Sequence, residues 1–436
     1  PFSFWHVKMR LIVGIATFFD AFDAVAIAYV MPVLIPLWNI APTQVGLLIS
    51  IGYLGQLIGA IFFGIFAERV GRVKSLILSV AILSIMSLCC AFSWSYMSLL
   101  IFRFIQGLGL GGEVPIAAAY INELSKAKGR GKFILLYELV FVVGLVCSAL
   151  LGYWIVPRFG WHYMFLIGAL PALALPLFLR SLPESPRWLA NHQRLDEAEQ
   201  VVEQLEVIVS KETKKELPPV NKTLNAQLEQ KKTDWRELFQ GIYLRRTLTV
   251  WVIWFCAYFV TYGLTTWLPS LYSNVFKLPL QQSLKFSLIT SFSGLIGAFA
   301  CAMLIDYVGR KTWFTGAFLG GAVFMILLWN AGAASPYVIL TYASLSYMFI
   351  SSISLALYLY SPEIYPTRMR ALGSSVGSAW LRIASAIGPF IVGVIVAGYS
   401  LSLAFALFGF VALFGAIITG LFAVETKGKV LEEISP

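Results

Sequence analysis

Residues 64–72 read Gly-Ile-Phe-Ala-Glu-Arg-Val-Gly-Arg, a short charged segment that separates two long apolar runs. A related segment, Asp-Tyr-Val-Gly-Arg-Lys, occupies residues 306–311 and separates another pair of apolar runs. Gly71 of the first segment and Gly309 of the second are 238 residues apart. This recurrence indicates that the chain contains two copies of one structural unit.

The apolar runs are long enough to cross a membrane. Of the 436 residues, 59% are apolar and 12% are charged, whereas soluble domains contain about 25% charged residues. A membrane-spanning helix needs about 20 apolar residues. Such runs fall at about 10–34, 44–67, 75–93, 96–119, 132–155 and 162–180, and again at 246–270, 284–305, 313–332, 337–360, 372–396 and 401–423. The composition therefore excludes a soluble enzyme, a disordered chain and a secreted disulfide scaffold.

Two further pairs of motifs recur at almost the same offset, 240 and 241 residues. They are Glu123 with Arg130 against Glu363 with Arg370, and Pro183-Glu184-Ser-Pro-Arg187 against Val424-Glu425-Thr-Lys427. Three motifs at one offset predict a duplicated six-helix unit. An even number of spans keeps both units in the same orientation, and parallel units of this kind meet at a central cavity.

We therefore predict an all-α membrane protein with twelve transmembrane helices in two pseudo-symmetric six-helix bundles. The first bundle covers residues 1–180 and the second covers 246–424. Residues 181–245 form a cytoplasmic linker, in which the stretch from Leu195 to Val209 has the periodicity of an amphipathic helix. Residues 425–436 form a cytoplasmic tail.

Basic residues alternate between the two sides of the predicted membrane. One set of loops carries only Arg158, Lys277 and Lys285. The other set carries Arg69, Arg72, Lys74, Lys126, Lys128, Arg130, Lys132, Arg310, Lys311, Arg368 and Arg370, together with the linker. Because cytoplasmic loops are rich in Lys and Arg, we expect a plasma-membrane protein with both termini in the cytoplasm. The net charge of +10 then faces the lipid headgroups of the bilayer and does not indicate nucleic acid as a partner.

Several common sites are not expected in this sequence. The five cysteines lie in apolar runs without a Cys-x-x-Cys pair or a Cys/His cluster, so neither a metal site nor a disulfide framework is predicted. Gly107-x-Gly109-x-x-Gly112 matches a dinucleotide fingerprint, but it follows no strand and lies inside an apolar run. We interpret these glycines as sites of close helix packing. No motif for ATP hydrolysis is present, and no cofactor is predicted.

Six ionisable residues lie inside predicted spans, where charge is costly and usually functional. They are Asp20, Asp23, Arg103, Glu113, Glu138 and Arg382. None of them has an ionisable counterpart after a shift of 240 residues, although the loop charges do. We expect duplicated charges to serve the scaffold and the gate, and unduplicated charges to serve the substrate and protons.

The acids are candidates for proton coupling. Asp20 and Asp23 lie one helical turn apart, and two close carboxylates in a low dielectric cannot both ionise cheaply. The alternative for them is a structural ion pair with Arg103. Glu113 and Glu138 are further candidates, although Glu138 is close enough to the cytoplasmic end to pair with a loop cation.

The substrate-binding candidates are two cations and five aromatic residues. Arg382 and Arg103 are suited to a carboxylate, with a structural ion pair as the alternative. Interfacial belts explain some of the aromatic residues. Those that could face a central cavity are Tyr137, Tyr258, Tyr262, Tyr347 and Trp380.

The motifs together resemble the major facilitator superfamily, and within it the metabolite:proton symporter and sugar-porter-like group that includes aromatic-acid and nicotinate carriers. The matching stretches are Arg103-x-x-x-Gly107-x-Gly109, Glu123 to Arg130-Gly131, Pro183-Glu-Ser-Pro-Arg187-Trp188, Glu363 to Arg370 and Glu425-Thr-Lys-Gly428. The resemblance implies that Asp23 is a proton site with Arg103 as its partner. The string Gly112-Glu113-Val-Pro115 is similar to nicotinate and general metabolite carriers.

The resemblance also implies a set of cytoplasmic ion pairs that lock the halves when the carrier faces outward and break when it faces inward. The residues of this cytoplasmic gate are Glu68, Arg69, Arg72, Glu123, Arg130, Glu184, Arg187, Asp306, Arg310, Glu363, Arg370 and Glu425.

The sequence thus predicts a monomeric, proton-coupled importer of a small organic acid such as nicotinate or a benzoate, and not an enzyme. A carrier of organic cations is the first alternative, because the four acids and two arginines inside the spans would attract cations if all were ionised. A sugar or polyol symporter is the second alternative. The stretch from Ala257 to Trp267 lacks the amide side chains that a sugar needs.

Overall fold

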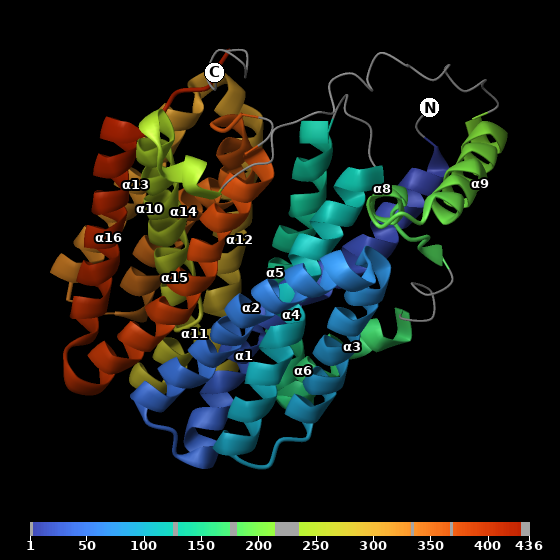
Figure 1. Cartoon of the computed structure of the whole chain (residues 1–436). Helices are drawn as coiled ribbons and strands as arrows, with labels where there is room; N and C mark the ends of the chain where they lie inside the picture. The colour runs from blue at the N-terminus through green and yellow to red at the C-terminus, as the bar shows by residue number, and fades with distance from the viewer. Residues whose placement is uncertain are drawn as a thin grey trace.

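The computed structural model describes residues 3–124, 130–174, 181–213, 235–332, 335–366 and 369–428, and its regular elements are all helices in these ranges (Figure 1). The first half begins with four long helices that run back and forth across the molecule. The elements of this half are α1 (Phe4–Trp38), α2 (Pro42–Val70), α3 (Arg72–Ala91), α4 (Tyr96–Leu124), α5 (Arg130–Phe159), α6 (His162–Gly168) and η1 (Leu170–Ala174).

The second half repeats this arrangement after the linker. The linker elements are α8 (Pro186–Asn191), α9 (Leu195–Thr213) and η3 (Trp235–Phe239). The elements of the second half are α10 (Gly241–Thr265), α11 (Leu268–Ser270), η4 (Leu271–Val275), α12 (Leu280–Val308), α13 (Arg310–Asn330), α14 (Pro336–Glu363), α15 (Arg370–Gly398) and α16 (Leu401–Phe422).

Within the described ranges, eleven helical segments are long and apolar enough to cross a membrane, with Gly241–Val275 counted as one segment. The predicted span at 162–180 is the one missing from this set. It appears as α6 followed by η1, and residues 175–180 lie outside the described part of the chain. The helical, membrane-spanning fold predicted from composition is therefore confirmed.

The glycines of α4 allow this helix to pack closely against α2 and α3, as predicted. A Cβ atom on Gly107 would lie 2.2 Å from the carbonyl oxygen of Gly52. A Cβ atom on Gly109 would lie 2.7 Å from the backbone nitrogen of Leu83. Any larger side chain would push these helices apart, so the glycine motif serves helix packing.

The two halves are in contact mainly through α2 with α15 and α5 with α12. A Cβ atom on Gly46 of α2 would lie 2.8 Å from the carbonyl oxygen of Pro389, and one on Gly393 of α15 would lie 2.7 Å from that of Pro42. Pro42 and Gly46 begin α2, so this close contact lies near the α1–α2 connection. The first residues of α1 and the end of α16 lie at the opposite end of the molecule (Figure 1).

Helix α9 is amphipathic, as its sequence predicts. Leu205 and Ile208 pack against a buried cluster that includes Trp5 and Met9 of α1. The backbone nitrogen of Trp5 also donates a hydrogen bond of 2.8 Å to Glu212 Oε2. The linker helix therefore rests against the start of the first transmembrane helix.

Candidate functional site

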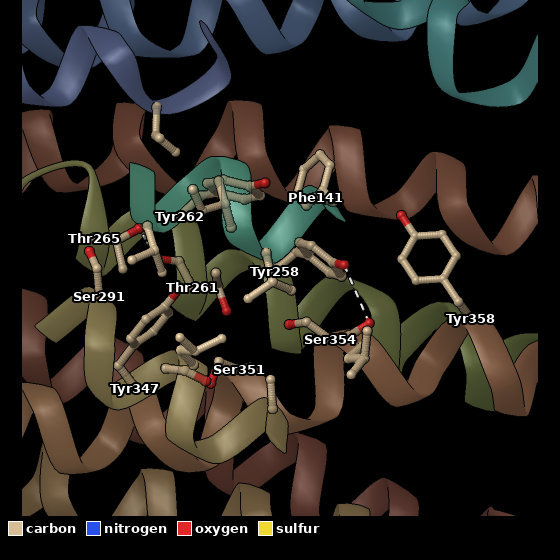
Figure 2. Close-up of a pocket in the computed structure, with 18 of the residues that line it drawn as sticks. Phe141, Tyr258, Thr261, Tyr262, Thr265, Ser291, Tyr347, Ser351, Ser354 and Tyr358 are labelled. Atoms are coloured by element: carbon tan, nitrogen blue, oxygen red, sulfur yellow. Dashed lines mark hydrogen bonds between the residues drawn. The ribbon is translucent and has the colours of Figure 1, made fainter. Parts of the chain in front are cut away.

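A cavity lies between the two halves, lined by α1 and α5 from the first half and by α10, α12 and α14 from the second (Figure 2). Its empty space, including the part that is open to solvent, is about 780 Å³. The polar lining residues are Tyr29, Tyr258, Thr261, Tyr262, Thr265, Ser291, Tyr347, Ser351, Ser354 and Tyr358. In the described part of the chain, this lining contains no charged residue and no Asn or Gln.

Some of the hydroxyl groups around the cavity are already paired, and others are available to a ligand. Tyr258 donates to the backbone carbonyl of Ser354 at 3.4 Å, and the hydroxyls of Tyr29 and Ser291 lie 3.2 Å apart. Thr261 Oγ1 and Ser354 Oγ are buried and have no hydrogen-bond partner among the described residues. Unpaired buried hydroxyls are costly unless a ligand or water satisfies them.

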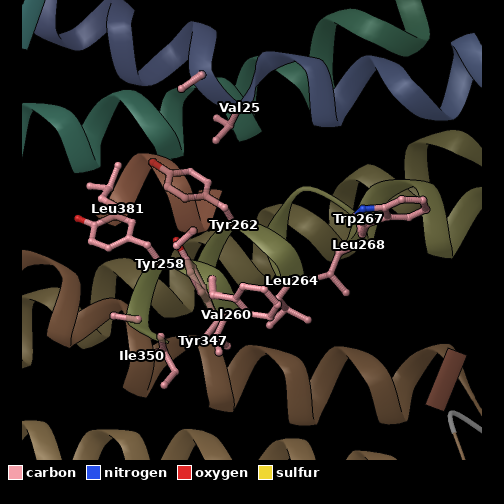
Figure 3. Packing of buried hydrophobic residues seen from close by; sticks show 14 of the residues in the cluster. Val25, Tyr258, Val260, Tyr262, Leu264, Trp267, Leu268, Tyr347, Ile350 and Leu381 are labelled. Carbon is pink, nitrogen blue, oxygen red and sulfur yellow. The ribbon is translucent and has the colours of Figure 1, made fainter. Parts of the chain in front are cut away.

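Three of the five predicted aromatic residues line this cavity. The rings of Tyr258 and Tyr262 stack with centroids 5.8 Å apart, and Tyr262 also contacts Tyr53 of α2 at 5.0 Å. Figure 3 shows Tyr258 and Tyr262 on the side of α10 that faces Val25 of α1. Tyr347 of α14 lines the cavity as well.

The cavity is also lined by residues of α14 that we did not predict from the sequence, although their spacing forms a recognisable pattern. Tyr347, Ser351, Ser354 and Tyr358 follow one another at spacings of four, three and four residues. This spacing places them on one face of α14. This spacing is the feature that points to Ser351, Ser354 and Tyr358, although α14 also carries hydroxyls outside the stripe, such as those of Thr341, Ser346 and Ser352.

The other substrate-binding candidates lie elsewhere. Trp380 packs against Trp251 and Phe255, at centroid distances of 5.3 and 6.2 Å. Arg382 Nη2 donates to the backbone carbonyl of Gly111 on α4 at 3.4 Å, so it bridges the halves outside the cavity lining. The side chain of Tyr137 lies outside the described residues.

Asp23 lies inside the first half and is fully buried. Its carboxylate accepts a hydrogen bond from Ser87 Oγ, which lies 3.2 Å from Asp23 Oδ1. Arg103 is also buried, and its Nη1 donates to the backbone carbonyl of Asp23 at 3.1 Å and to Gln106 Oε1 at 2.7 Å. The predicted partners are thus brought together, although the hydrogen bond from Arg103 goes to the backbone of Asp23.

Asp20 faces a different arginine. The charge of Arg382 acts on the buried carboxylate of Asp20, whose Oδ1 has no hydrogen-bond partner among the described residues. Glu113 is fully buried and accepts a hydrogen bond of 2.9 Å from Thr17 on α1. The side chain of Glu138 lies outside the described residues. The buried Asp20, Asp23 and Arg103 and the partly buried Arg382 therefore form a charged cluster around α1.

The duplicated acids Glu184 and Glu425 cap the two helices that follow the repeated glycines. Glu184 Oε1 accepts from the backbone nitrogen of Arg72 at 2.9 Å, and Glu425 Oε1 accepts from that of Arg310 at 2.8 Å. Each capped helix follows a glycine at positive φ, Gly71 at 117° and Gly309 at 98°. Burial alone would raise the pKa of Glu425, but the backbone N–H groups that donate to its carboxylate lower that pKa overall.

Among the described residues, the following ion pairs of the predicted gate connect residues of the same half. Arg72 pairs with Glu68 at 2.8 Å. Arg310 pairs with Asp306 at 2.7 Å and with Glu363 at 3.1 Å. Arg69 and Arg187 are exposed and Arg370 is partly buried, whereas the side chains of Glu123 and Arg130 lie outside the described residues. A lock between the halves stays a prediction.

Comparisons with known proteins agree with this architecture. The family profile described as "Sugar (and other) transporter" matches residues 20–436. The chain is 35% identical to the niacin transporter NiaP of Acinetobacter baylyi, over 100% of this chain and 97% of the relative. It is 32% identical to a putative niacin/nicotinamide transporter NiaP of Bacillus subtilis, over 98% of both chains.

A solved structure of the xylose transporter XylE from E. coli, in a partially occluded inward open conformation, has the same fold. Its TM-score is 0.76 at 19% identity, over 98% of this chain and 100% of that one. The sequence relatives are named transporters and not enzymes. The chain therefore belongs to the sugar (and other) transporter family of the major facilitator superfamily, and it is a multi-pass membrane transporter.

Proposed function

We propose that this transporter imports a small aromatic acid of the nicotinate type, and that proton uptake drives the import. The observation that carries the proposal is the cavity between the halves, whose lining combines tyrosine rings with free hydroxyl groups. The similarity to niacin transporters supports the same class of substrate.

The cavity suits a flat ring that bears one polar group. A volume of about 780 Å³ lies within the range of roughly 300–1,000 Å³ that small-molecule sites occupy. The stacked rings of Tyr258 and Tyr262 offer an aromatic surface. The hydroxyls of Thr261 and Ser354 are then free to donate hydrogen bonds to a carboxylate or a ring nitrogen.

The same lining argues most directly against a sugar. The described lining contains no carboxylate for an organic cation, but tyrosine rings also attract cations, so the uptake comparison below separates a cation from nicotinate. A sugar is best held by amide side chains that both donate and accept, and the described lining contains no Asn or Gln. The buried acids lie close to α1 and outside this lining.

We assign proton coupling to the charged cluster of Asp20, Asp23, Arg103 and Arg382. A proton on Asp20 would remove the negative charge on which Arg382 acts. Arg382, which is partly buried, would then be available to an anion, because a cation that is shielded from water gains from a charged partner. Binding of an anionic substrate and uptake of a proton therefore favour each other.

The topology is part of the proposal. Two six-helix bundles, at 1–180 and 246–424, are joined by a linker at 181–245 and followed by a tail at 425–436. We place the termini and the linker in the cytoplasm of a plasma-membrane protein that works as a monomer. The bias of Lys and Arg toward one set of loops supports this orientation.

The test is uptake into proteoliposomes with and without an inward proton gradient. Radiolabelled nicotinate is compared with nicotinamide, benzoate, an organic cation and xylose. We expect nicotinate to accumulate against its gradient in the wild type. Asp23→Asn should lose this accumulation but still exchange internal for external substrate. The control Asp196→Asn, at an exposed position on α9, should behave as the wild type.

Accumulation by Asp23→Asn equal to that of the wild type would refute the proton assignment. Transport of the cation or of xylose in preference to nicotinate would refute the substrate assignment.

A further inference from the structure

Ser87 on α3 is placed between two acceptors that belong to different helices. Its side chain is fully buried. Its Oγ lies 3.2 Å from Asp23 Oδ1 on α1 and 2.9 Å from the backbone carbonyl oxygen of Phe165 on α6. A serine hydroxyl has one hydrogen, so it can donate to only one of these two acceptors at a time.

We propose that Ser87 is a positioning residue that reports the protonation state of Asp23 to helix α6. This inference rests on the proposed proton coupling at Asp23. With Asp23 ionised, the Ser87 hydroxyl donates to Oδ1. When a proton from solvent binds to Oδ1, the new O–H donates to Ser87 Oγ, and the Ser87 hydrogen turns to the carbonyl of Phe165.

The choice of Oδ1 follows from the surroundings of the carboxylate. Asp23 Oδ2 is buried and has no hydrogen-bond partner among the described residues. A proton on Oδ1 leaves the new O–H paired with Ser87, whereas a proton on Oδ2 would leave a buried donor unpaired there. The protonated state that keeps Asp23, Ser87 and Phe165 paired is therefore the one on Oδ1.

Gly168 gives independent support, because it brings α6 into contact with the same two groups. A Cβ atom on Gly168 would lie 2.1 Å from Asp23 Oδ1 and 2.6 Å from Ser87 Oγ. Only glycine fits at this distance. Helix α6 ends at Gly168 and is followed by η1, which contains Pro171, so Asp23 and Ser87 lie beside the end of this helix.

The Gln106 side chain also stabilises the ionised carboxylate of Asp23, but Gln106 has no hydrogen bond to α6 among the described residues, so it does not replace Ser87 as a link to that helix. The charges that face Asp23 are Arg103 on α4 and Asp20 on α1, with the thiol of Cys90 nearby on α3. Arg103 Nη1 donates to the backbone carbonyl of Asp23 and to the Gln106 amide. Helix α6 contributes the carbonyl of Phe165 and the backbone of Gly168, neither of which titrates.

The chain provides a matched control one turn before Ser87. Ser84 on the same helix is 1% exposed, and its Oγ has no hydrogen-bond partner among the described residues. Ser84→Ala therefore removes an equally buried hydroxyl without removing a contact to Asp23. Ser87→Ala removes the hydroxyl, and Ser87→Cys keeps nearly the same volume but is a weak donor.

The experiment measures initial uptake of nicotinate as a function of pH, and accumulation under a proton gradient, for all three variants. The bond from Ser87 to the ionised carboxylate is charge-assisted and stronger than the bond to the neutral form. Loss of this hydrogen bond destabilises the ionised carboxylate. The midpoint of the pH profile should therefore lie about one pH unit higher in both Ser87 variants, which corresponds to roughly tenfold tighter proton binding. Ser84→Ala should keep the wild-type profile, and substrate binding in a thermal-shift assay should remain in every variant.

The outcomes separate this inference from the proposed function. If the wild type shows no proton-driven accumulation, the proposed function is wrong and the inference is wrong with it. If the wild type accumulates nicotinate and both Ser87 variants match Ser84→Ala, only the role of Ser87 is overturned.

A second measurement leaves Ser87 unchanged, so it tests the inference even if the Ser87 variants do not fold. The acid-minus-alkaline infrared difference spectrum should contain a carboxyl band that Asp23→Asn removes. The frequency of that band should be that of a hydrogen-bonded carboxyl. An unbonded frequency would overturn the inference.

Discussion

Replacing Tyr29 by Phe should weaken the contact that holds the two halves in the observed arrangement. The Tyr29 hydroxyl of α1 lies 3.2 Å from Ser291 Oγ of α12, so this hydrogen bond crosses from one half to the other. Tyr29 itself is 5% exposed, and both residues line the cavity. Phe keeps the ring and its packing, which isolates the effect of the hydroxyl.

The expected size follows from a single buried, neutral hydrogen bond. Such a bond contributes about 0.5–1.5 kcal/mol, which corresponds to a shift of roughly two- to tenfold in the equilibrium between arrangements. Ser291→Ala should give a similar shift. The double variant should give no more than either single change, because both remove the same bond.

The assay measures the distance between spin labels across the contact of the halves. The native cysteines are first replaced, and spin labels are then attached at Ala41→Cys and Ser400→Cys. Both positions are exposed, and they flank the contact between α2 and α15. The fraction of molecules with a long distance should rise in Tyr29→Phe. Thr265→Val, which removes a lining hydroxyl that bonds within α10, serves as the control. Unchanged distances, or fully additive effects of the two changes, would refute the reasoning.

Two further predictions concern charged residues. Arg382→Lys keeps the charge but loses the planar guanidinium group, so the affinity for nicotinate should fall about tenfold. The control Arg158→Lys should keep the wild-type affinity. If Arg382→Lys binds nicotinate as tightly as Arg158→Lys does, Arg382 has no role in anion recognition. Because the pKa of Glu425 is lowered in the folded protein, its contribution to stability is present above the unfolded pKa and is lost as pH falls through the folded value. Glu425→Gln should therefore lower the unfolding free energy by about 1 kcal/mol at neutral pH and by less in acid. The exposed Glu203→Gln should have no such effect, and a pH-independent loss would show that the charge is not responsible.

Much of the fold could be predicted from the sequence, since long apolar runs in a lipid environment leave few alternatives to helices. The offset of about 240 residues predicted that Glu184 and Glu425 occupy equivalent positions in the two halves, but both were predicted as gate residues and not as helix caps. The capping geometry depends on a tertiary approach of each acid to a glycine at positive φ. The break of the sixth span after Gly168 has a local signal in Pro171, which cannot donate a backbone hydrogen bond to an α-helix, but the apolar composition of 162–180 alone predicted an unbroken span.

The candidate site was predictable only in part. Tyr258, Tyr262 and Tyr347 were identified because large aromatic residues deep in spans are conspicuous. Tyr29 and Ser291 carried no such signal, since an isolated hydroxyl in an apolar run can face lipid, protein or cavity. The role of Arg382 in substrate binding stays a prediction, but sequence periodicity does not fix the rotation of α15 and so could not show that the hydrogen bond of Arg382 goes to α4.

In the proposed mechanism, helix α1 links the proton site to the contact between the two halves. Asp23 on this helix faces Ser87 and the interior of the first half, whereas Tyr29 faces the cavity and Ser291 of the second half. The two residues are six positions apart, about 9 Å along the helix axis. Because an intact helix moves as a rigid element, a shift of α1 that follows protonation of Asp23 must also move Tyr29. The hydrogen bond between the halves and the shape of the cavity then change together with the proton site. Proton coupling therefore requires no direct contact between the substrate and Asp23, and Tyr29→Phe should weaken coupling more than it weakens substrate binding.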